Sequence, residues 1–467
     1  MKKAQKKLYI IVAVAFILIA IATGIIIWFL SNQETVSKAL KLGNEYLSEL
    51  DYDSAIKEYS KVLTLDPLNE EALTGLAMSY AGQGNVEMAT SLFSNDLGNT
   101  KDIDVLRSYA QFLEKIQRYP SAVNIIYRIV EMEDNDDDYK WLNDVLEKSM
   151  NTRHDYAEST SNSISMEDKT VYTMGSNVLG ALGITTGLGS LSSTSQLAEA
   201  GFSGNARSVY TTGAGTAVID ENDTLWLAGS NRSGQKANSS VEMLATSGWT
   251  EVTTLQKVAK VAGIGNTTFA LTKSGELYII GGNNSYLSGA SWVSDWTKIS
   301  GYGKIRDIQC SSNITAFLTV DGKLYMNYYT DYYGYYEVTA RWSCIADNVS
   351  VYSVKTDDVT YYTADGFIND YNRYISFPEN WAVYDESGYT YLGSKPLFGV
   401  KGIAFVEDSL FLLADDGILY MVNSTTVKEV SMNGSIDSIY STGTSCVVQF
   451  EDGEYQLLDS SGAVKTL

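Results

Sequence analysis

The sequence predicts a multidomain chain with one transmembrane helix, an α-helical repeat region and an all-β propeller. Three observations lead to this fold class. An uncharged apolar run lies near the amino terminus, apolar residues then recur at helical spacing, and short strand pairs with tight turns recur after them. We therefore expect a tail at residues 1–7, a membrane span at 8–30, helical repeats at 34–150, a linker at 151–168 and a propeller at 169–467.

The composition excludes several classes of protein. The 34 Lys and Arg residues stand against 56 Asp and Glu, a net charge of -22. Because phosphate backbones are held by clustered positive charge, a nucleic-acid partner is not expected. The chain has one histidine, His154, so a Ser/His/Asp triad or a zinc site with two imidazoles is not expected either. Three distant cysteines, Cys310, Cys344 and Cys446, form no metal knuckle and are expected to be small buried apolar residues.

The sequence also lacks the common catalytic motifs. It contains no GxxxxGK[ST] phosphate loop, no HExxH and no GxSxG. We therefore expect no catalytic residue, no metal and no cofactor, and a protein that is not an enzyme. An enzyme that cleaves glycans with carboxylates is an alternative that the sequence leaves open.

The apolar run at residues 8–30 predicts the membrane anchor. It is 23 residues long and carries no charge, enough to span a bilayer as a helix. A cleaved signal peptide is the alternative, although its apolar core is normally shorter. Four lysines precede the run, so the amino terminus is expected in the cytoplasm and the rest of the chain outside it, at the cell membrane. The four are Lys2, Lys3, Lys6 and Lys7.

The region from 34 to 150 shows a repeat of about 34 residues. Small residues recur at two positions of each unit and large apolar residues lie beside them. The small residues are Gly43, Ala77 and Ala110 at the first position, and Ala55, Ala89 and Ala122 at the second. This pattern resembles the tetratricopeptide repeat in three copies, with residues 139–150 as a helix that covers the open end.

The tetratricopeptide resemblance implies that the inner face of the array holds a peptide or a partner helix. The candidate partner-binding residues on that face are Asn44, Thr74, Met78, Arg107 and Gln111. Arg107 is the one cation that the resemblance places there, so a ligand with a terminal carboxylate is not expected. The alternative is that the three repeats act as a spacer or as a self-association module.

The region after residue 168 carries six strand–turn–strand copies. They lie at 216–230, 268–282, 315–328, 359–371, 410–423 and 446–459. Five turns end in a glycine, and Asp223 marks the turn of the first copy. Glycine supplies the positive φ that such hairpins need, and the spacing allows one four-stranded sheet per unit of a propeller.

Part of this pattern resembles a known propeller family. Gly275-Glu-Leu-Tyr278 followed by Gly281-Gly-Asn-Asn284 is similar to the regulator-of-chromosome-condensation type of repeat. The resemblance implies seven blades, and we expect the segment near Val171 to share one sheet with the copy at 446–459. The GTPase-exchange and chromatin-binding roles of some family members are not carried over, because this chain is acidic and fold resemblance alone gives no activity.

The sequence favours a non-enzymatic, membrane-anchored scaffold outside the cytoplasm that binds envelope proteins or peptides through both repeat regions. A tyrosine cluster that includes Tyr332 and Tyr333 supports an alternative, since exposed tyrosines stack on sugars or anchor interfaces. In that alternative the protein binds cell-wall polymer or another carbohydrate.

Overall fold

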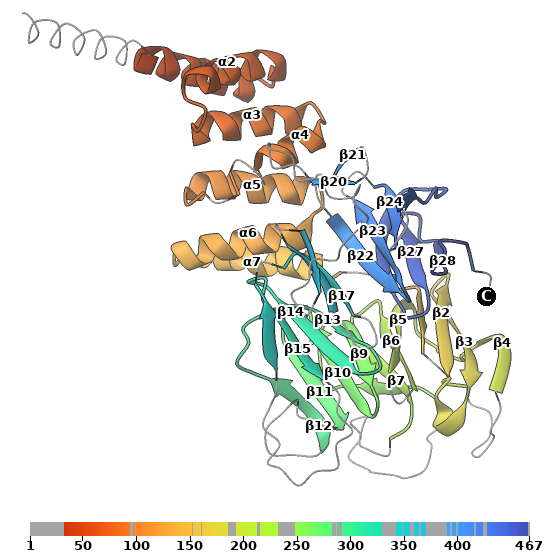
Figure 1. Cartoon of the computed structure of the whole chain (residues 1–467). Coiled ribbons are helices and arrows are strands. Elements are labelled where there is room, and N and C mark those ends of the chain that lie inside the picture. The colour runs from red at the N-terminus through yellow and green to blue at the C-terminus, as the bar shows by residue number, and fades with distance from the viewer. Residues whose placement is uncertain are drawn as a thin grey trace, which may run out of the picture. The chain divides into compact units, whose positions relative to one another are not determined.

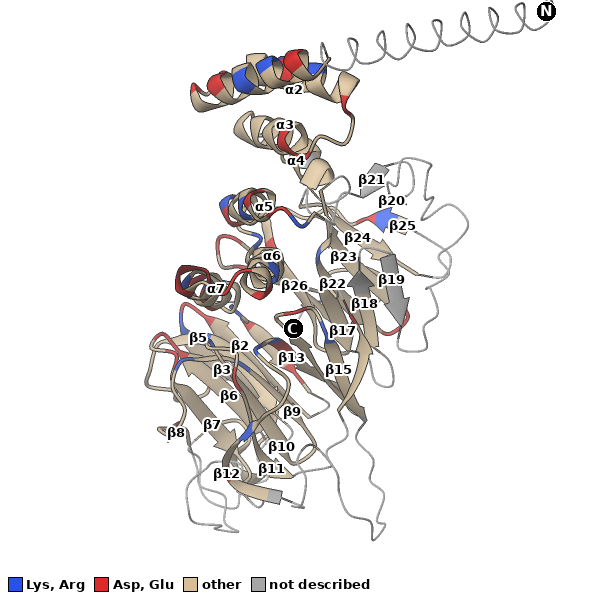
Figure 2. Cartoon of the chain, turned by 90° about the vertical axis from the view of Figure 1, so that its left-hand side faces the viewer, with Lys and Arg blue, Asp and Glu red and all other residues tan. Residues whose placement is uncertain are grey.

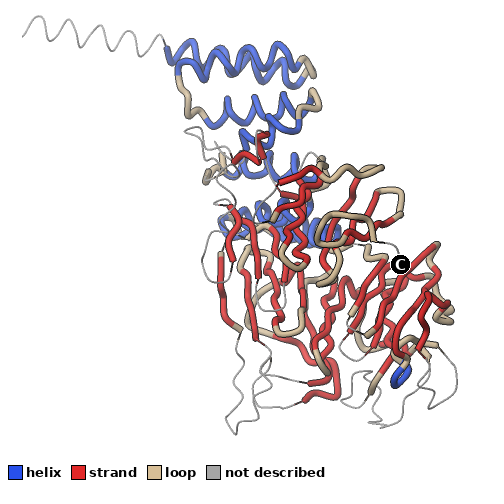
Figure 3. Tube along the Cα trace, turned by 45° about the vertical axis from the view of Figure 1, so that its right-hand side comes forward, coloured by secondary structure: helices blue, strands red, loops and turns tan. Residues whose placement is uncertain are grey.

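The structure is a computed structural model, and it describes most of the chain from residue 32 to residue 465. The described residues have gaps at 94–96, 99, 152, 160, 185–192, 213–214, 232–247, 283–285, 287–291, 329–341, 348, 355–358, 364–365, 370–389, 393–394, 398–399, 415–416 and 424–426. The chain divides into two compact units, residues 1–112 and 113–467. Helices give way to strands along the sequence (Figure 3).

The expected fold class and location are wrong in one essential part. Among the described residues no helix is long and apolar enough to cross a membrane. The predicted span at 8–30 and the tail at 1–7 lie outside the described residues. The structure therefore does not support the predicted single-pass membrane location. The described fold is a helical region followed by a β-propeller (Figure 1).

The helical region begins with a helix at residues 32–48. The further helices are α2 (Tyr52–Leu65), α3 (Glu70–Gly82), α4 (Val86–Ser91), α5 (Ile103–Lys115), α6 (Tyr119–Met132), α7 (Asp136–Ser149) and a short 3₁₀ helix at Val178–Gly180. Side chains of Asp51, Asn69, Asn85 and Asn135 accept a backbone N–H at the starts of α2, α3, α4 and α7. Each such cap stabilises its helix by about 1 kcal/mol, so the sequence itself fixes where these helices begin.

The small residues of the 34-residue pattern are buried. Ala55, Ala77, Ala89, Ala110 and Ala122 each have no exposed surface. In the first unit, Ala55, Tyr59 and Val62 of α2 form one apolar cluster with Ala72 and Leu76 of α3. Small side chains at these positions let neighbouring helices approach closely. Because each helix pair needs such a contact, small residues recur along the sequence with a period of about 34.

The strands form successive antiparallel sheets. Five described sheets have four strands, two have three, and β20–β21 is a separate pair. The four-stranded sheets are β1–β4 (Tyr156–Glu158, Asn162–Glu167, Thr170–Ser176, Ser193–Glu199), β5–β8 (Ala206–Thr212, Gly215–Asp220, Leu225–Gly229, Thr250–Val252), β9–β12 (Val258–Ile264, Thr267–Thr272, Leu277–Gly282, Trp292–Ile299), β13–β16 (Ile305–Cys310, Ile314–Thr319, Leu324–Tyr328, Ser343–Ala346) and β22–β25 (Val400–Val406, Ser409–Ala414, Leu419–Val422, Val427–Glu429). The others are β17–β19 (Val351–Val354, Val359–Thr363, Gly366–Asn369), β20–β21 (Thr390–Leu392, Lys395–Leu397) and β26–β28 (Ile436–Ser441, Cys446–Phe450, Tyr455–Leu458).

All six predicted hairpins are antiparallel strand pairs. They are β6–β7, β10–β11, β14–β15, β18–β19, β23–β24 and β27–β28. Gly275, Gly322, Gly417 and Gly453 have φ between +77° and +91°, and Asp223 has φ +62°. Glycine reaches this region without a steric penalty, which explains the repeated Asp-Gly and Ser-Gly turns.

Three of the hairpin turns also help to place the next sheet. The carbonyl of the turn residue accepts the backbone N–H that begins, or closely precedes, the first strand of the following sheet. These bonds run from Val258 to Asp223, from Ile305 to Gly275 and from Val349 to Gly322, each at 2.9 Å. Such a turn closes its own hairpin, and its carbonyl also holds the first strand of the next sheet at hydrogen-bond distance.

The prediction that the first and last segments share one sheet is wrong. Residues 162–176 form their own hairpin, β2–β3, within the sheet β1–β4, whereas 446–458 pair within the sheet β26–β28. The two segments therefore do not share one sheet, and the described strands form five sheets of four strands, two of three strands and one separate pair. The range 151–168, which composition predicted to be a linker, contains β1 and β2.

The helices α6 and α7 belong to the same compact unit as the propeller (Figure 1). Arg306 on β13 is 9% exposed and donates to the carbonyl oxygens of Pro120 at 3.4 Å, Val349 at 3.0 Å and Ser350 at 2.9 Å. Burial lowers the pKa of Arg306 to about 10, so the guanidinium keeps its charge at neutral pH. Carbonyl partners of this kind offset the cost of burying that charge, and they attach the start of α6 to β13.

Candidate functional site

A buried tyrosine organises the first helical repeat. The ring of Tyr59 on α2 has no exposed surface and lies between two glycines. A Cβ added at Gly43 would lie 2.7 Å from Tyr59 Cε1, and one at Gly75 would lie 2.2 Å from Tyr59 Cζ. Real side chains do not approach so closely, so glycine at both positions is what allows the ring to sit between the helices.

The Tyr59 hydroxyl begins a short hydrogen-bond chain. It donates to Asn44 Oδ1 at 2.6 Å, and Asn44 Nδ2 donates to Glu71 Oε1 at 2.9 Å. Burial, and secondly the charge of Glu71, raises the pKa of Tyr59 to about 12, so the phenol remains protonated and able to donate at neutral pH. These hydrogen bonds fix the amide orientation of Asn44 and tie the Glu71 carboxylate of α3 to the helix at 32–48.

Asn44 and Glu71 lie in the wall of a cavity of about 1140 Å³. This volume exceeds the range of about 300–1,000 Å³ that is usual for pockets of drug-sized ligands. The lining combines apolar side chains with hydrogen-bonding ones from the helix at 32–48, the end of α2 and the start of α3. The lining residues are Asn32, Gln33, Val36, Ser37, Leu40, Lys41, Asn44, Glu45, Ser48, Leu65, Asp66, Asn69 and Glu71. We call this cavity the helical groove.

The charge of the helical groove is negative. Its lining holds three acidic residues, Glu45, Asp66 and Glu71, and one basic residue, Lys41. Lys41 Nζ lies 3.9 Å from Glu45 Oε1 in an exposed pair, which contributes little because water screens it. Figure 2 shows acidic and basic residues interspersed on the helices at α2, and the whole chain is acidic, with 56 Asp and Glu against 34 Lys and Arg, so the groove shares the acidic excess of the chain.

The predicted partner-binding residues lie in different places. Asn44 lines the helical groove, whereas Thr74 and Met78 are half-buried on α3 and are not among its lining residues. Arg107 is half-buried and Gln111 exposed on α5. Tyr332 and Tyr333 lie outside the described residues.

Several lining residues were not among the candidates that the sequence predicted. Lys41, Glu45 and Ser48 follow Ser37 and Asn44 at spacings of four on one helix, so periodicity could have found them. Leu65 is the last residue of α2, and Asp66 and Asn69 come from the loop between α2 and α3. No sequence signal marked this loop as part of the same surface, because its approach to residues 32–40 depends on how the helices pack.

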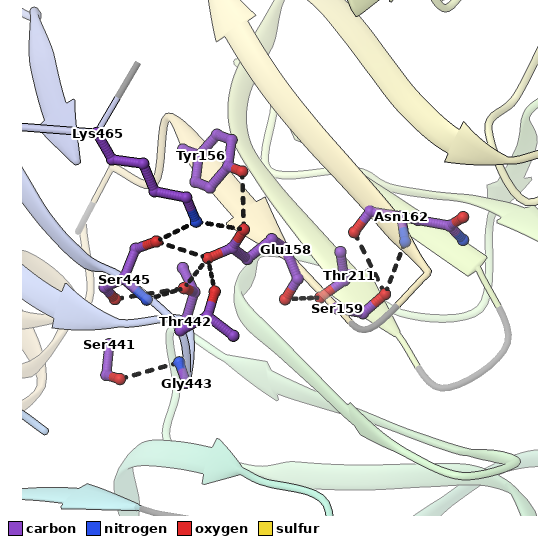
Figure 4. Close-up of polar contacts among 11 residues, drawn as sticks. Tyr156, Glu158, Ser159, Asn162, Thr211, Ser441, Thr442, Gly443, Ser445 and Lys465 are labelled. Atoms are coloured by element: carbon purple, nitrogen blue, oxygen red, sulfur yellow. Dashed lines mark hydrogen bonds and ion pairs between the residues drawn. The ribbon is translucent and has the colours of Figure 1, made fainter. Parts of the chain in front are cut away.

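A second polar cluster joins the first and last sheets of the propeller (Figure 4). Glu158 on β1 accepts hydrogen bonds at Oε1 from the hydroxyls of Thr442 at 2.6 Å, Ser445 at 2.8 Å and Thr444. Its other oxygen, Oε2, lies 3.6 Å from Lys465 Nζ and accepts from the Tyr156 hydroxyl at 3.1 Å. We call Glu158 and these partners the ring junction.

The electrostatics of the ring junction favour a charged Glu158. Burial on its own would raise the pKa of this carboxyl, but hydrogen bonds from Thr442, Thr444 and Ser445 and the charge of Lys465 together lower it. Two further contacts cross the same boundary, because Gln449 donates to Asp155 Oδ2 at 2.7 Å and the Tyr440 hydroxyl donates to the Tyr156 carbonyl at 2.9 Å. All of these hydrogen bonds are made between residues of this protein. Because they connect the first sheet to the last, they hold the propeller closed.

The single histidine is part of the same boundary. The ring of His154 lies 4.1 Å from that of Tyr440 and 5.0 Å from that of Tyr210, measured between centroids. Burial, followed by the positive charges of Lys260 and Arg207, lowers the pKa of His154 well below its ordinary value. His154 is therefore a neutral aromatic packing residue at physiological pH.

The fold and these two regions define a repeat protein in which a helical region carries a groove and a β-propeller follows it. No protein-family model matches the sequence, and no curated protein matches it. The solved structure of Prp20p from Saccharomyces cerevisiae, described with its binding to Gsp1p and histones, is 14% identical, covers 67% of this chain and 84% of its own, and gives a TM-score of 0.47.

Two further solved structures are similar to this chain. Human WBSCR16 is 16% identical, with 60% of this chain and 83% of that chain covered and a TM-score of 0.45. BamB from Moraxella catarrhalis is 9% identical, with coverage of 64% and 82% and a TM-score of 0.34. At such identities a similarity concerns the fold alone, and the propeller assignment rests on the strands described above.

Proposed function

We propose that this protein is a non-enzymatic scaffold whose helical region is a tetratricopeptide array that binds a peptide segment of a partner protein. The β-propeller is a second, rigid platform on the same chain. Two binding platforms on one chain raise the local concentration of a second partner once the first is bound. The absence of common catalytic motifs from the sequence supports a role without catalysis.

The helical groove is the observation that carries this proposal. Its volume of about 1140 Å³ has room for several residues of a peptide, and its wall offers both apolar contacts and hydrogen-bonding groups. Peptide recognition by helical arrays needs this combination, since apolar contacts give affinity and polar groups fix the register. The buried alanines at a spacing of about 34 residues support the tetratricopeptide assignment.

A matched pair of substitutions tests the groove. Ser37 and Lys38 are both exposed neighbours on the helix at 32–48, but Ser37 lines the groove and Lys38 does not. Short random peptides displayed on phage would be selected on the full-length chain, and the affinities of the enriched peptides measured by fluorescence anisotropy. Ser37→Trp should weaken binding by more than about ten-fold because the indole would occupy space in the groove that the peptide needs, whereas Lys38→Trp should leave binding unchanged.

The result that would refute the proposed function is equally specific. Enriched peptides that bind Ser37→Trp as tightly as the parent chain would show that the helical groove is not the binding site. Circular dichroism of both variants checks that the helices remain folded, so a loss of binding is assigned to the groove and not to unfolding.

A further inference from the structure

We propose that the helical groove selects a peptide segment with a lysine or arginine side chain next to apolar residues. This inference rests on the proposed function and names its class of partner. The cationic side chain would lie against Glu71, and its apolar neighbours would contact Val36, Leu40 and Leu65. The partner is thus a protein with an exposed basic and apolar segment.

Charge complementarity is the first argument for a basic ligand. The lining contains Glu45, Asp66 and Glu71 against Lys41 alone, a balance of -2 from three negative charges and one positive charge. Lys41 is paired with Glu45, so the charge that faces an incoming peptide comes mainly from the other two carboxylates. A basic segment is attracted to such a wall, while an acidic segment is repelled by it.

Glu71 is prepared for this contact by its neighbours. Asn44 holds Oε1 at 2.9 Å, and Tyr59 holds Asn44 in turn. Among the described residues, no hydrogen bond or ion pair occupies Glu71 Oε2. A carboxylate with one oxygen anchored and the other unoccupied loses little conformational entropy when a guanidinium or ammonium group binds it.

Asp66 differs from Glu71 in this respect. Its Oδ2 accepts from Asn69 Nδ2 at 3.0 Å, and this bond joins two residues of the exposed loop between α2 and α3. Leu65, beside it, is 42% exposed, so an apolar side chain of a peptide would cover surface that now faces water. Removing such apolar area from water favours binding by about 25 cal/mol per Å². A ligand that combines both kinds of contact fits the groove better than one that is purely ionic.

The selection described above tests this inference separately from the proposed function. The random peptides that lose binding on Ser37→Trp are sequenced and their Lys and Arg content is compared with that of the unselected library. Enrichment of Lys or Arg beside apolar residues supports the inference. Peptides that need the groove but show no such enrichment, or are enriched in Asp and Glu, overturn it and leave the proposed function standing.

A charge substitution gives the second measurement. Glu71→Gln keeps an oxygen that can accept from Asn44 but removes the charge. Binding of a selected Lys-containing peptide, measured by fluorescence anisotropy, should weaken by about two- to five-fold, the size expected for a partly exposed ion pair. The matched control is Glu49→Gln, since Glu49 is exposed directly after the helix at 32–48 and does not line the groove.

Two further measurements vary the salt concentration and the charge of the peptide. The affinity difference between the parent chain and Glu71→Gln should shrink when salt is raised, because exposed charges are screened. The same peptide with norleucine in place of lysine should bind both proteins equally. An equal loss for Glu71→Gln with the lysine and the norleucine peptide would show that Glu71 acts only through the shape of the groove, and would overturn the proposal.

Discussion

Replacing Glu158 by glutamine should loosen the contact between the first and last sheets of the propeller. The Glu158 side chain is 11% exposed and accepts bonds from three hydroxyls on the segment 442–445 as well as from Tyr156. Hydrogen bonds to a charged group contribute about 1.5–3 kcal/mol each. Glutamine keeps one acceptor oxygen, so the variant loses part of this stabilisation, and we expect a loss of about 2–3 kcal/mol.

The expected thermal shift follows from the size of the unit. Residues 113–467 form one compact unit of roughly 350 residues, for which the entropy of unfolding is about 0.7 kcal/mol/K. A loss of 2–3 kcal/mol then lowers Tm by about 3–4 °C. Differential scanning calorimetry of the full chain measures this shift, and hydrogen exchange shows whether β1 and β26–β28 open first.

The pH dependence of the same variant gives an independent check. The pKa of Glu158 is lowered from 4.5 in the folded protein, so the folded state favours the charged carboxylate. Its stabilising contribution is therefore present above the unfolded pKa and is lost as pH falls through the lower folded value. The Tm difference between the parent chain and Glu158→Gln should be constant near pH 7 and shrink below about pH 4.

The control is Glu199→Gln, an exposed residue at the end of β4 in the same first sheet. This variant makes the same chemical change far from the ring junction and should leave Tm within about 0.5 °C. The reasoning is wrong if Glu158→Gln and Glu199→Gln have the same Tm, because the ring junction would then contribute nothing to closure.

Three further changes test other parts of the structure. Gly75→Ala should destabilise the helical region by about 1–3 kcal/mol, because its Cβ would lie 2.2 Å from Tyr59 Cζ, and urea unfolding followed by circular dichroism measures the loss. Arg306→Met should cost about 2–4 kcal/mol in calorimetry, since several carbonyl oxygens that now accept from the guanidinium lose their partner. With iodoacetamide and mass spectrometry, exposed Cys344 should react first and buried Cys446, whose pKa burial raises, only after unfolding.

Each of these predictions has a result that contradicts it. An unchanged urea midpoint for Gly75→Ala would mean that the Tyr59 ring can move aside at no cost. Lys401→Met is the control for Arg306→Met, because Lys401 is exposed and reaches a single carbonyl, that of Ile436, at 3.4 Å. Equal losses of stability for the two variants would show that the buried bonds of Arg306 contribute no more than an exposed lysine. Alkylation of Cys446 in the folded chain at the rate of Cys344 would show that β27 opens readily.

The sequence by itself determined the local features of this protein. Turns that end in Gly275, Gly322, Gly417 and Gly453 were predicted because a positive φ depends on the residue itself. The alanines of the 34-residue pattern were predicted to pack closely, and they are buried. Asn44 was named as a candidate because the tetratricopeptide resemblance places it on the inner face of the array, and it lines the groove.

The tertiary structure alone decided the features that join distant parts of the chain. Residues 151–168 are polar and lack an apolar period, yet they supply β1, β2 and Glu158, whose partners lie 284–287 residues away in the sequence. A strand of three residues is set by pairing with its neighbours and not by its own propensity. The end of α2 and the loop after it, residues 65–69, line the groove for the same reason. Their position depends on how the helices pack, and packing depends on the whole set of buried side chains at once.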